Sequence, residues 1–219
     1  SASEIKFPIK RIVDIGGGDA YIINEIFKHK LADEYFTIDT AYSPEIIAQL
    51  KVNYGENAIH YVQNLTDYFN TFPTEENVLF LCMDVLEHLE NEDEILQHLT
   101  HKNNYFLFAV PAFQTVFSQH DVLLGHYRRY NLKQLEKLLT NNQFQISDKG
   151  YYFSSLLLVR WIESIFNKNK KASIDNWTGT TFKSKLLVAI LQLDFAFTRV
   201  IQKFGIKIYG LSCYCICKK

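Results

Sequence analysis

The first two thirds of the chain alternate between two patterns of hydrophobic and polar residues. Short apolar runs predict buried strands, and longer stretches with apolar residues three or four positions apart predict amphipathic helices. The runs expected as strands are residues 12–15, 34–39, 58–62, 78–82 and 105–110, and the stretches expected as helices are residues 20–31, 44–53, 91–99 and 132–141. Strands that alternate with helices predict a mostly parallel sheet with helices on both faces.

The last third of the chain has a different pattern. Residues 150–166 are rich in aromatic and leucine side chains, and a polar, lysine-rich linker follows at 167–171. Residues 182–204 place apolar side chains at helical spacing among basic ones, and residues 209–217 alternate as a strand does. A basic amphipathic helix packs on its own domain, covers an apolar pocket or lies on a membrane surface, and the sequence leaves these three uses open.

A run of glycines joins the first expected strand to the first expected helix. The segment RIVDIGGGDAY, residues 11–21, contains Gly16, Gly17 and Gly18. Glycine tolerates a positive φ and, lacking a Cβ, lets a ligand approach the backbone. Dinucleotide-binding turns need a third spaced glycine where this chain has Tyr21. Asp14 precedes the glycines and another aspartate follows them, so the turn would repel a phosphate and attract an ammonium group. The pattern predicts a site for a nucleoside with a positively charged amino-acid tail.

Residues 14–20 resemble the first motif of the class I S-adenosylmethionine-dependent methyltransferases, roughly Asp/Glu-x-Gly-x-Gly-x-Gly, with Ala20 in place of the last glycine. The resemblance implies that S-adenosyl-L-methionine is the cofactor and that residues 1–219 form a single methyltransferase domain. The implied α/β fold is Rossmann-like: a doubly wound, mostly parallel seven-stranded sheet with an antiparallel last strand and helices on both faces. Residues 151–208 are then expected to be a helical elaboration or lid.

Two further residues are expected to hold the nucleoside. Asp39 ends the second expected strand, about 20 residues beyond the glycines, where an acidic residue accepts hydrogen bonds from ribose hydroxyls in nucleotide-binding α/β folds. Asn64 follows the third strand, where the resembling family places a partner for the adenine amino group. An asparagine that caps the next helix is the alternative for Asn64.

The segment after the fourth strand, Asp84-Val85-Leu86-Glu87-His88, resembles the D-V-L-E-H segment of one branch of these methyltransferases. The resemblance puts Met83 and Asp84 beside the methionine part of the cofactor. His88 is a candidate proton acceptor, and a structural role in shaping the pocket is its alternative.

A long segment after the fifth strand, residues 110–130, resembles the P-A-x(n)-H-D-x(3)-G-H-x-R-R-Y segment of the same branch. Loops of this length inside compact domains are usually functional, so we expect a substrate wall. His120 and His126 are the candidate catalytic residues. The predicted substrate contacts are Tyr127, Arg128 and Arg129, although the two arginines could instead pair with acidic neighbours and anchor the loop.

The expected reaction is transfer of the sulfonium methyl group to a small-molecule or lipid-like acceptor by in-line displacement, in which positioning supplies much of the acceleration. A hydroxyl acceptor would need a base, and histidine titrates in a suitable range. A non-catalytic protein that binds S-adenosylmethionine is one alternative. A nicotinamide oxidoreductase is another, which the missing third glycine disfavours.

Composition narrows the partners and the compartment. The 23 basic and 24 acidic residues balance, so no overall field favours nucleic acid. Cys213, Cys215 and Cys217 alternate without nearby histidines, which favours small apolar residues of a strand over a metal site, and no metal is expected. No run reaches the ~18 apolar residues that span a bilayer. We expect a cytoplasmic protein with peripheral membrane contact as an option. The start, Ser-Ala-Ser, is typical of a tag remnant, and a helix that covers the cofactor is expected to be missing there.

Overall fold

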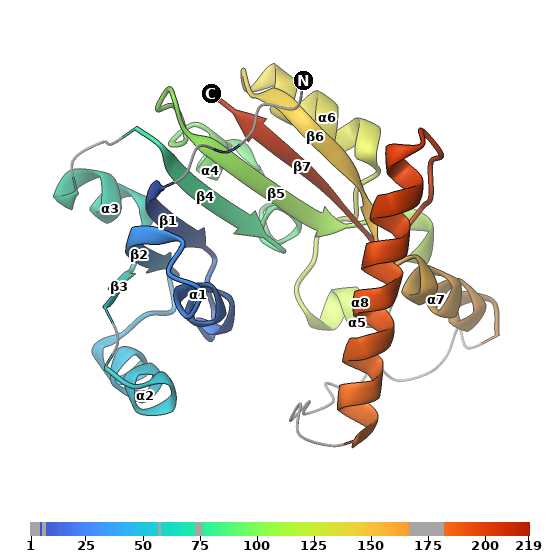
Figure 1. The fold of residues 1–219 in the computed structure, drawn as a ribbon, viewed down its shortest axis with the longest axis horizontal. Coiled ribbons are helices and arrows are strands. Elements are labelled where there is room, and N and C mark those ends of the chain that lie inside the picture. The colour runs from blue at the N-terminus through green and yellow to red at the C-terminus, as the bar shows by residue number, and fades with distance from the viewer. Residues whose placement is uncertain (1–4, 6–7, 57, 73–75, 167–181) are drawn as a thin grey trace.

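A seven-stranded sheet organises the computed structural model, which describes residues 5, 8–56, 58–72, 76–166 and 182–219 (Figure 1). Its order is β3-β2-β1-β4-β5-β7-β6. The strands are β1 (Ile9–Ile15), β2 (Ala32–Ile38), β3 (Ile59–Val62), β4 (Val78–Met83), β5 (Tyr105–Pro111), β6 (Gln145–Tyr152) and β7 (Ser212–Lys218). The first five are parallel to their neighbours, whereas β7 runs antiparallel to both β5 and β6. The expected sheet with an antiparallel last strand is therefore confirmed.

Helices cover both faces of the sheet. They are α1 (Tyr21–Phe27), α2 (Pro44–Tyr54), α3 (Leu65–Thr71), α4 (Asp93–Leu96), α5 (Gln119–Leu123), α6 (Leu132–Asn141), α7 (Ser154–Phe166) and α8 (Phe182–Lys203), with short 3-10 turns η1 (Leu86–His88) and η2 (Gln114–Val116). One apolar core joins the sheet to α3, α4 and α6, and a second joins the other face to α1 and α2.

Alternation along each strand divides the side chains between the two cores. In β1, Val13 packs in the larger core and Ile12 in the smaller one. In β7, the three cysteines 213, 215 and 217 lie in the larger core as buried free thiols. The prediction that they share one face of the last strand is confirmed.

Strand β6 and helices α3 and α5 were not predicted, and α5 lies in residues 110–130, which were expected to form a loop. Strand β6 has the sequence QISDKGYY, which lacks the apolar run that predicts a buried strand. It can contain these polar residues because it is an edge strand with partly exposed positions. Helix α3 has only seven residues, too few for a clear helical period. The expected helices at 20–31 and 91–99 are shorter in the structure, since α1 ends at Phe27 and α4 covers only Asp93–Leu96. The linker expected at 167–171 lies outside the described residues.

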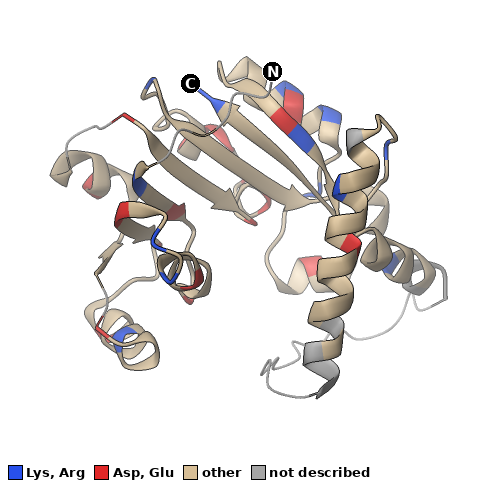
Figure 2. Ribbon diagram, in the orientation of Figure 1, with Lys and Arg blue, Asp and Glu red and all other residues tan. Residues whose placement is uncertain are grey.

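Helix α8 presents its apolar residues to solvent. Figure 1 shows α7 and α8 at the end of the sheet toward which β4 and β5 point, and Figure 2 shows mostly uncharged residues along the part of α8 that is coloured by charge. The exposed apolar side chains of α8 and the segment after it are Leu186, Val188, Ile190, Leu193, Phe195, Phe197, Val200, Phe204 and Ile206. The alternative that this apolar stripe packs on the domain is therefore wrong.

Polar contacts attach α8 instead. Asp194 accepts hydrogen bonds from the backbone and hydroxyl of Ser155 in α7. Arg199 pairs with Asp148 of β6 at 2.8 Å, and Gln202 donates to the Tyr151 carbonyl. Among the described residues, no helix is both long and apolar enough to cross a membrane.

Candidate functional site

The glycine turn lies at the carboxyl end of β1. Gly16 and Gly17 both donate backbone hydrogen bonds to the Ile38 carbonyl at the end of β2, at 2.8 and 3.2 Å. A Cβ on Gly16 would lie 2.5 Å from Val85, and one on Gly17 would lie 1.9 Å from the Thr37 hydroxyl. Gly18 has φ +49° and open space where its Cβ would be. The first two glycines are therefore required by packing, and the third leaves the backbone open to a ligand.

Asp14 lies beside this turn with unsatisfied hydrogen-bonding capacity. Its side chain is buried, and one carboxylate oxygen has no hydrogen-bond partner. Burial, together with the charges of Asp19 and Asp39, raises the pKa of Asp14 to about 7. A cationic ligand group would satisfy this oxygen and neutralise the acidic cluster. The ammonium group of a methionine tail has the required charge.

Asp39 follows β2 and faces the same turn. Its carboxylate accepts hydrogen bonds from the backbone of Gly18 and of Ala41, both at 2.9 Å. A carboxylate has about four lone-pair sites, so both oxygens of the half-buried Asp39 keep acceptor capacity for ribose hydroxyls. Asn64 is the N-cap of α3, and its side chain accepts from the Asp67 backbone and donates to the Asp67 carboxylate. Its adenine contact stays a prediction beside this capping role.

Met83 and Asp84 end β4 at the same edge, as expected. Asp84 adopts a left-handed conformation with φ 53°, and Phe113 and Phe153 do the same after β5 and β6, with φ 64° and 63°. Non-glycine residues in this conformation are strained and concentrate at functional sites. Burial raises the pKa of Asp84, while the charges of His126 and Arg129 oppose this shift.

The loop after β5 is organised by a buried aspartate. Asp121 accepts from the Arg129 guanidinium at 2.6 Å and from the Ser118 backbone at 2.8 Å, and it lies 3.1 Å from Nδ1 of His126. Burial opposes ionisation, but the hydrogen bond and charge of Arg129 hold the pKa of Asp121 below its usual value. Sequence reasoning did not identify Asp121, although it directly follows His120.

The two predicted substrate arginines make anchoring contacts. Arg129 reaches Asp121 and the Ala112 carbonyl, and Arg128 pairs with Glu92 at 2.6 Å. These are the ion pairs expected under the alternative interpretation, and substrate contact by either arginine stays a prediction. Tyr127 is more than half exposed.

The two candidate bases lie in different surroundings. His126 belongs to the Asp121 network, with its side chain nearly buried. His120 is half-buried in α5. Their catalytic roles stay predictions.

A second cluster joins this loop to the end of β4. Nε2 of His126 lies 4.0 Å from Oε1 of Glu87, and the rings of His126 and His88 meet edge to face with centroids 4.6 Å apart. Burial, together with the charge of Asp84, raises the pKa of Glu87 to about 8. The sequence pointed to both histidines but not to Glu87.

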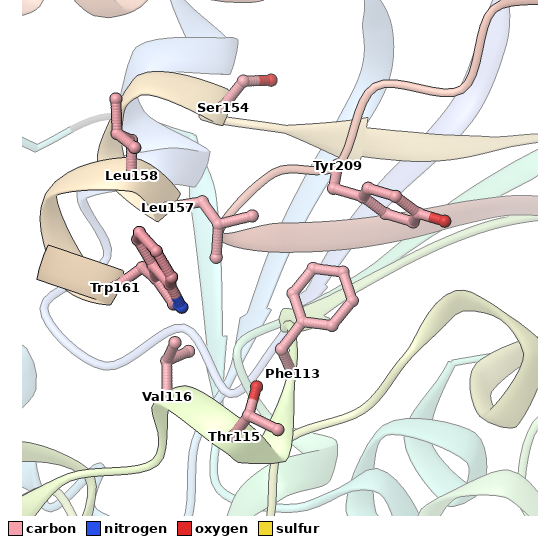
Figure 3. A pocket seen from close by; sticks show the side chains of 8 residues that line it. All are labelled: Phe113, Thr115, Val116, Ser154, Leu157, Leu158, Trp161 and Tyr209. Carbon is pink, nitrogen blue, oxygen red and sulfur yellow. The ribbon is translucent and has the colours of Figure 1, made fainter. Parts of the chain in front are cut away.

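An apolar pocket of about 370 Å³ opens next to the loop (Figure 3). It is lined by Phe113, Thr115, Val116, Ser154, Leu157, Leu158, Trp161 and Tyr209. The pocket therefore lies where β5 and β6 end, between the predicted substrate wall and α7. The aromatic run at 150–166 was the sequence signal for this wall. Among the side chains that the structure describes, the helix expected to cover such a pocket, residues 182–204, contributes none to the lining.

No protein-family model matches the chain, and no curated protein matches it. Solved structures do match. A Bacillus halodurans C-125 protein with a proposed methyltransferase activity has a TM-score of 0.54 at 14% identity, over 100% of this chain and 95% of its own. An O-methyltransferase family 2 protein from Planctomyces limnophilus DSM 3776, solved with apigenin, has a TM-score of 0.53 at 9% identity, over 100% and 53%. Mitomycin 7-O-methyltransferase MmcR has a TM-score of 0.51 at 15% identity, over 68% and 47%.

At sequence identities this low, the likeness concerns the fold and does not extend to the substrate. The likeness extends over the whole of this chain in the first two of these neighbours. The chain has the fold of the class I S-adenosylmethionine-dependent methyltransferases.

Proposed function

We propose that the protein transfers the methyl group of S-adenosylmethionine to a small, apolar acceptor. The observation that carries the proposal is the buried Asp14 carboxylate, which has an unpartnered oxygen and stands beside the open backbone of Gly18. Burying a charged or polar group without a partner is costly, so such a group in a cleft is a strong indication of a ligand. The methyltransferase fold of the neighbours supports this cofactor.

Each cofactor contact has a distinct chemical task. Asp14 would pair with the ammonium group of the methionine tail, and Asp39 would accept from the ribose hydroxyls. Met83 and Asp84 would flank the tail at the end of β4. The acceptor atom then forms a bond to the methyl carbon while the S–CH₃ bond breaks, and its electron pair stays on sulfur to give S-adenosylhomocysteine. A hydroxyl acceptor passes its proton to a base, for which His120 and His126 are the candidates.

The apolar pocket supports an acceptor with an aromatic or aliphatic body. Its volume of about 370 Å³ lies within the usual range of small-molecule sites, and its lining is mostly hydrocarbon. Leu158, Trp161 and Tyr209 line the pocket and are each more than half exposed. A lipid-like acceptor could therefore enter from an apolar phase without crossing water.

The first experiment measures binding. The wild-type protein, Asp14→Asn and a surface control, Asp33→Asn, are titrated with S-adenosylmethionine and with NADH by calorimetry. We expect the wild type and the control to bind S-adenosylmethionine and not NADH, and Asp14→Asn to bind at least tenfold more weakly. Equal affinities in all three proteins would contradict the site, and preferential NADH binding would favour the oxidoreductase.

The second experiment separates an enzyme from a non-catalytic binder. The protein is incubated with labelled S-adenosylmethionine and an organic-solvent extract of cells, and mass spectrometry follows S-adenosylhomocysteine and any metabolite that gains one methyl group. Release of S-adenosylhomocysteine only when the extract is present supports transfer. Tight binding without release in any extract fraction supports a sensor or partner subunit.

We further propose that the exposed face of α8 contacts a membrane surface. Leu193, Phe197 and Phe204 are 72%, 62% and 79% exposed, and they belong to a series of exposed apolar side chains along α8 and the segment after it rather than to scattered surface positions. The chain from 182 to 207 has four lysines and Arg199 against the single acidic Asp194, a balance that favours anionic lipid.

Vesicle co-sedimentation tests this contact. The wild type is expected to bind vesicles of mixed neutral and anionic lipid, and the double variant Leu193→Ser/Phe197→Ser should lose most of that binding while keeping affinity for S-adenosylmethionine. Light scattering is run in parallel without lipid. A stable dimer that the same double variant dissociates would show instead that this face binds a second copy of the chain.

A further inference from the structure

Glu87 is a buried carboxylate without hydrogen-bond donors. Its side chain is fully buried in η1, and neither of its oxygens has a hydrogen-bond partner. A buried ionisable group normally has a partner, because the loss of solvation is otherwise uncompensated. The nearest basic side chain is His126, whose Nε2 stands 4.0 Å from Oε1 of Glu87, which is too long for a hydrogen bond.

His126 is oriented by its other nitrogen. Its Nδ1 lies 3.1 Å from Oδ1 of Asp121, and Asp121 is itself fixed by Arg129. If Nδ1 carries the proton toward Asp121, the lone pair of Nε2 faces the Glu87 carboxylate. When Glu87 is ionised, two acceptors face each other across a gap, an arrangement that a cation between them would satisfy. Metal-binding histidines commonly have this carboxylate partner on the nitrogen away from the metal.

His88 completes the cluster from the same turn as Glu87. Its ring packs edge to face on His126, and it is hydrogen-bonded to the backbone of Gly125. A carboxylate oxygen of Glu87 and one ring nitrogen each of His88 and His126 all lie within 4.8 Å of one another. Bonds of about 2.0–2.2 Å in tetrahedral geometry place ligand atoms about 3.4 Å apart, so side-chain rotations that bring these atoms together would close the site.

We propose that Glu87, His88 and His126 bind a divalent transition-metal ion at the carboxyl end of β4. Two imidazoles and one carboxylate suit zinc and its neighbours in the first transition series rather than magnesium or calcium, which prefer oxygen ligands. Three protein ligands also leave a coordination position open. No metal was expected from the sequence, where only the cysteines 213, 215 and 217 were weighed as ligands. His88 and His126 are 38 residues apart, and only the fold brings them together.

The position of this site suggests its use, and this step rests on the proposed methyl transfer. Asp84, expected beside the methionine tail, lies between the end of β4 and the turn that contains Glu87 and His88. A metal-bound hydroxyl loses its proton near neutral pH. The acceptor class would then be an alcohol, phenol or enol: its O–H proton leaves to water or His120, the oxygen forms the O–CH₃ bond, and the sulfonium carbon–sulfur bond breaks.

The cluster has a competing explanation without metal. A doubly protonated His126 between Asp121 and Glu87 would also place positive charge in the gap. This explanation predicts that the cluster has no affinity for metal ions, so direct metal binding distinguishes the two.

The experiment measures metal binding without cofactor or acceptor. The protein is dialysed against a chelator and titrated with Co²⁺, followed by visible absorption, and with Zn²⁺ in competition with a chromophoric chelator. We expect one equivalent to bind to the wild type and to the surface control His29→Asn. Glu87→Gln and His88→Asn should each bind at least tenfold more weakly, and their Co²⁺ spectra should change.

His88 is exposed, so His88→Asn is expected to fold even if the substitution at the buried Glu87 does not. Circular dichroism and S-adenosylmethionine affinity check the fold of each variant. No stoichiometric binding by the wild type, or equal affinity in His88→Asn and the wild type, would overturn the metal site. Because metal and S-adenosylmethionine are titrated separately, failure of the metal site leaves the proposed methyl transfer standing, and the reverse also holds.

Discussion

At the scale of single residues, the cofactor site depends on one buried charge. Asp14 lies 3% exposed at the end of β1, with Asp19 and Asp39 close enough to raise its pKa. The protein without ligand therefore contains an acid that is costly to ionise. The ionised form of Asp14 becomes favourable when a cation binds. As the pH rises, the stability of the ligand-free protein should therefore fall while its affinity for the cation rises.

Asp14→Asn should stabilise the protein without ligand at alkaline pH. The pKa of Asp14 is raised from 3.8 to about 7, so its favourable contribution is complete below pH 3.8 and is lost as pH rises through about 7. The loss amounts to at most about 4 kcal/mol. The free energy of unfolding, measured in urea from pH 4 to 8, should show a gain for the variant that grows up to about pH 7. A gain independent of pH would contradict a buried titrating Asp14.

Cofactor affinity should show the opposite pH dependence. Below about pH 7, S-adenosylmethionine must displace a proton from Asp14, so the affinity of the wild type should fall by up to about tenfold per pH unit. Asp14→Asn should bind weakly at every pH between 5.5 and 7. Calorimetric titrations at matched ionic strength test this, and parallel profiles for the two proteins would remove Asp14 from the ammonium site.

Two neighbouring glycines should separate folding from binding. Gly17→Ala places a methyl group 1.9 Å from the hydroxyl of the fully buried Thr37 and should cost about 1–3 kcal/mol or more of stability. Gly18→Ala meets open space at φ +49° and should cost only about 1–2 kcal/mol. Its methyl group would instead occupy the expected cofactor surface. In thermal denaturation Gly17→Ala should therefore be the less stable variant. In titration with S-adenosylmethionine Gly18→Ala should be the weaker binder.

At the scale of elements, α8 combines a polar attachment with an exposed apolar face. Thr198 is 1% exposed and lies 3.1 Å from the Ser154 hydroxyl, whereas its neighbour Phe197 is 62% exposed. The usual arrangement of an amphipathic helix is the reverse. The position of a residue on this helix should therefore predict the effect of substitution better than its polarity does.

Substitutions at these two adjacent positions test that inversion. Phe197→Ser should change the free energy of unfolding by no more than about 0.5 kcal/mol, as expected at an exposed position. Thr198→Glu would bury a charge against α7 and should destabilise the protein by at least about 2 kcal/mol. Urea denaturation measures both. Strong destabilisation by Phe197→Ser would mean that the apolar face of α8 is covered in solution.

At the scale of the whole molecule, the sequence predicted most of the sheet. Apolar runs identified β1, β4 and β5 because these central strands are buried on both faces. The strands β2 and β3 were identified from more mixed runs. Strand β6 was missed because an edge strand tolerates polar residues. The cofactor turn could be located because its glycines and aspartates are consecutive, and the contacts between Glu87 and His126 could not, because they depend on how two loops meet in space.

The packing also divides the molecule into parts of different stability. Strands β1, β4 and β5 lie in the middle of the sheet between two apolar cores, whereas α8 is attached mainly to β6 and α7 by polar contacts. Backbone amides of α8 should therefore exchange with deuterium on the order of 100-fold faster than those of β1, β4 and β5. Mass spectrometry of the exchanged protein tests this, and equal protection would show that α8 opens only with global unfolding.

The place of β7 has a consequence for synthesis. Ser212 follows Tyr152 by 60 residues, yet β7 lies between β5 and β6. While the ribosome is still making α7 and α8, β5 therefore has an unpaired edge rich in phenylalanine, and β6 has no partner in the sheet. Such an edge attracts other chains. A nascent chain stalled before Ser212 should be a substrate for chaperones, and emergence of the cysteine-containing strand should end that dependence.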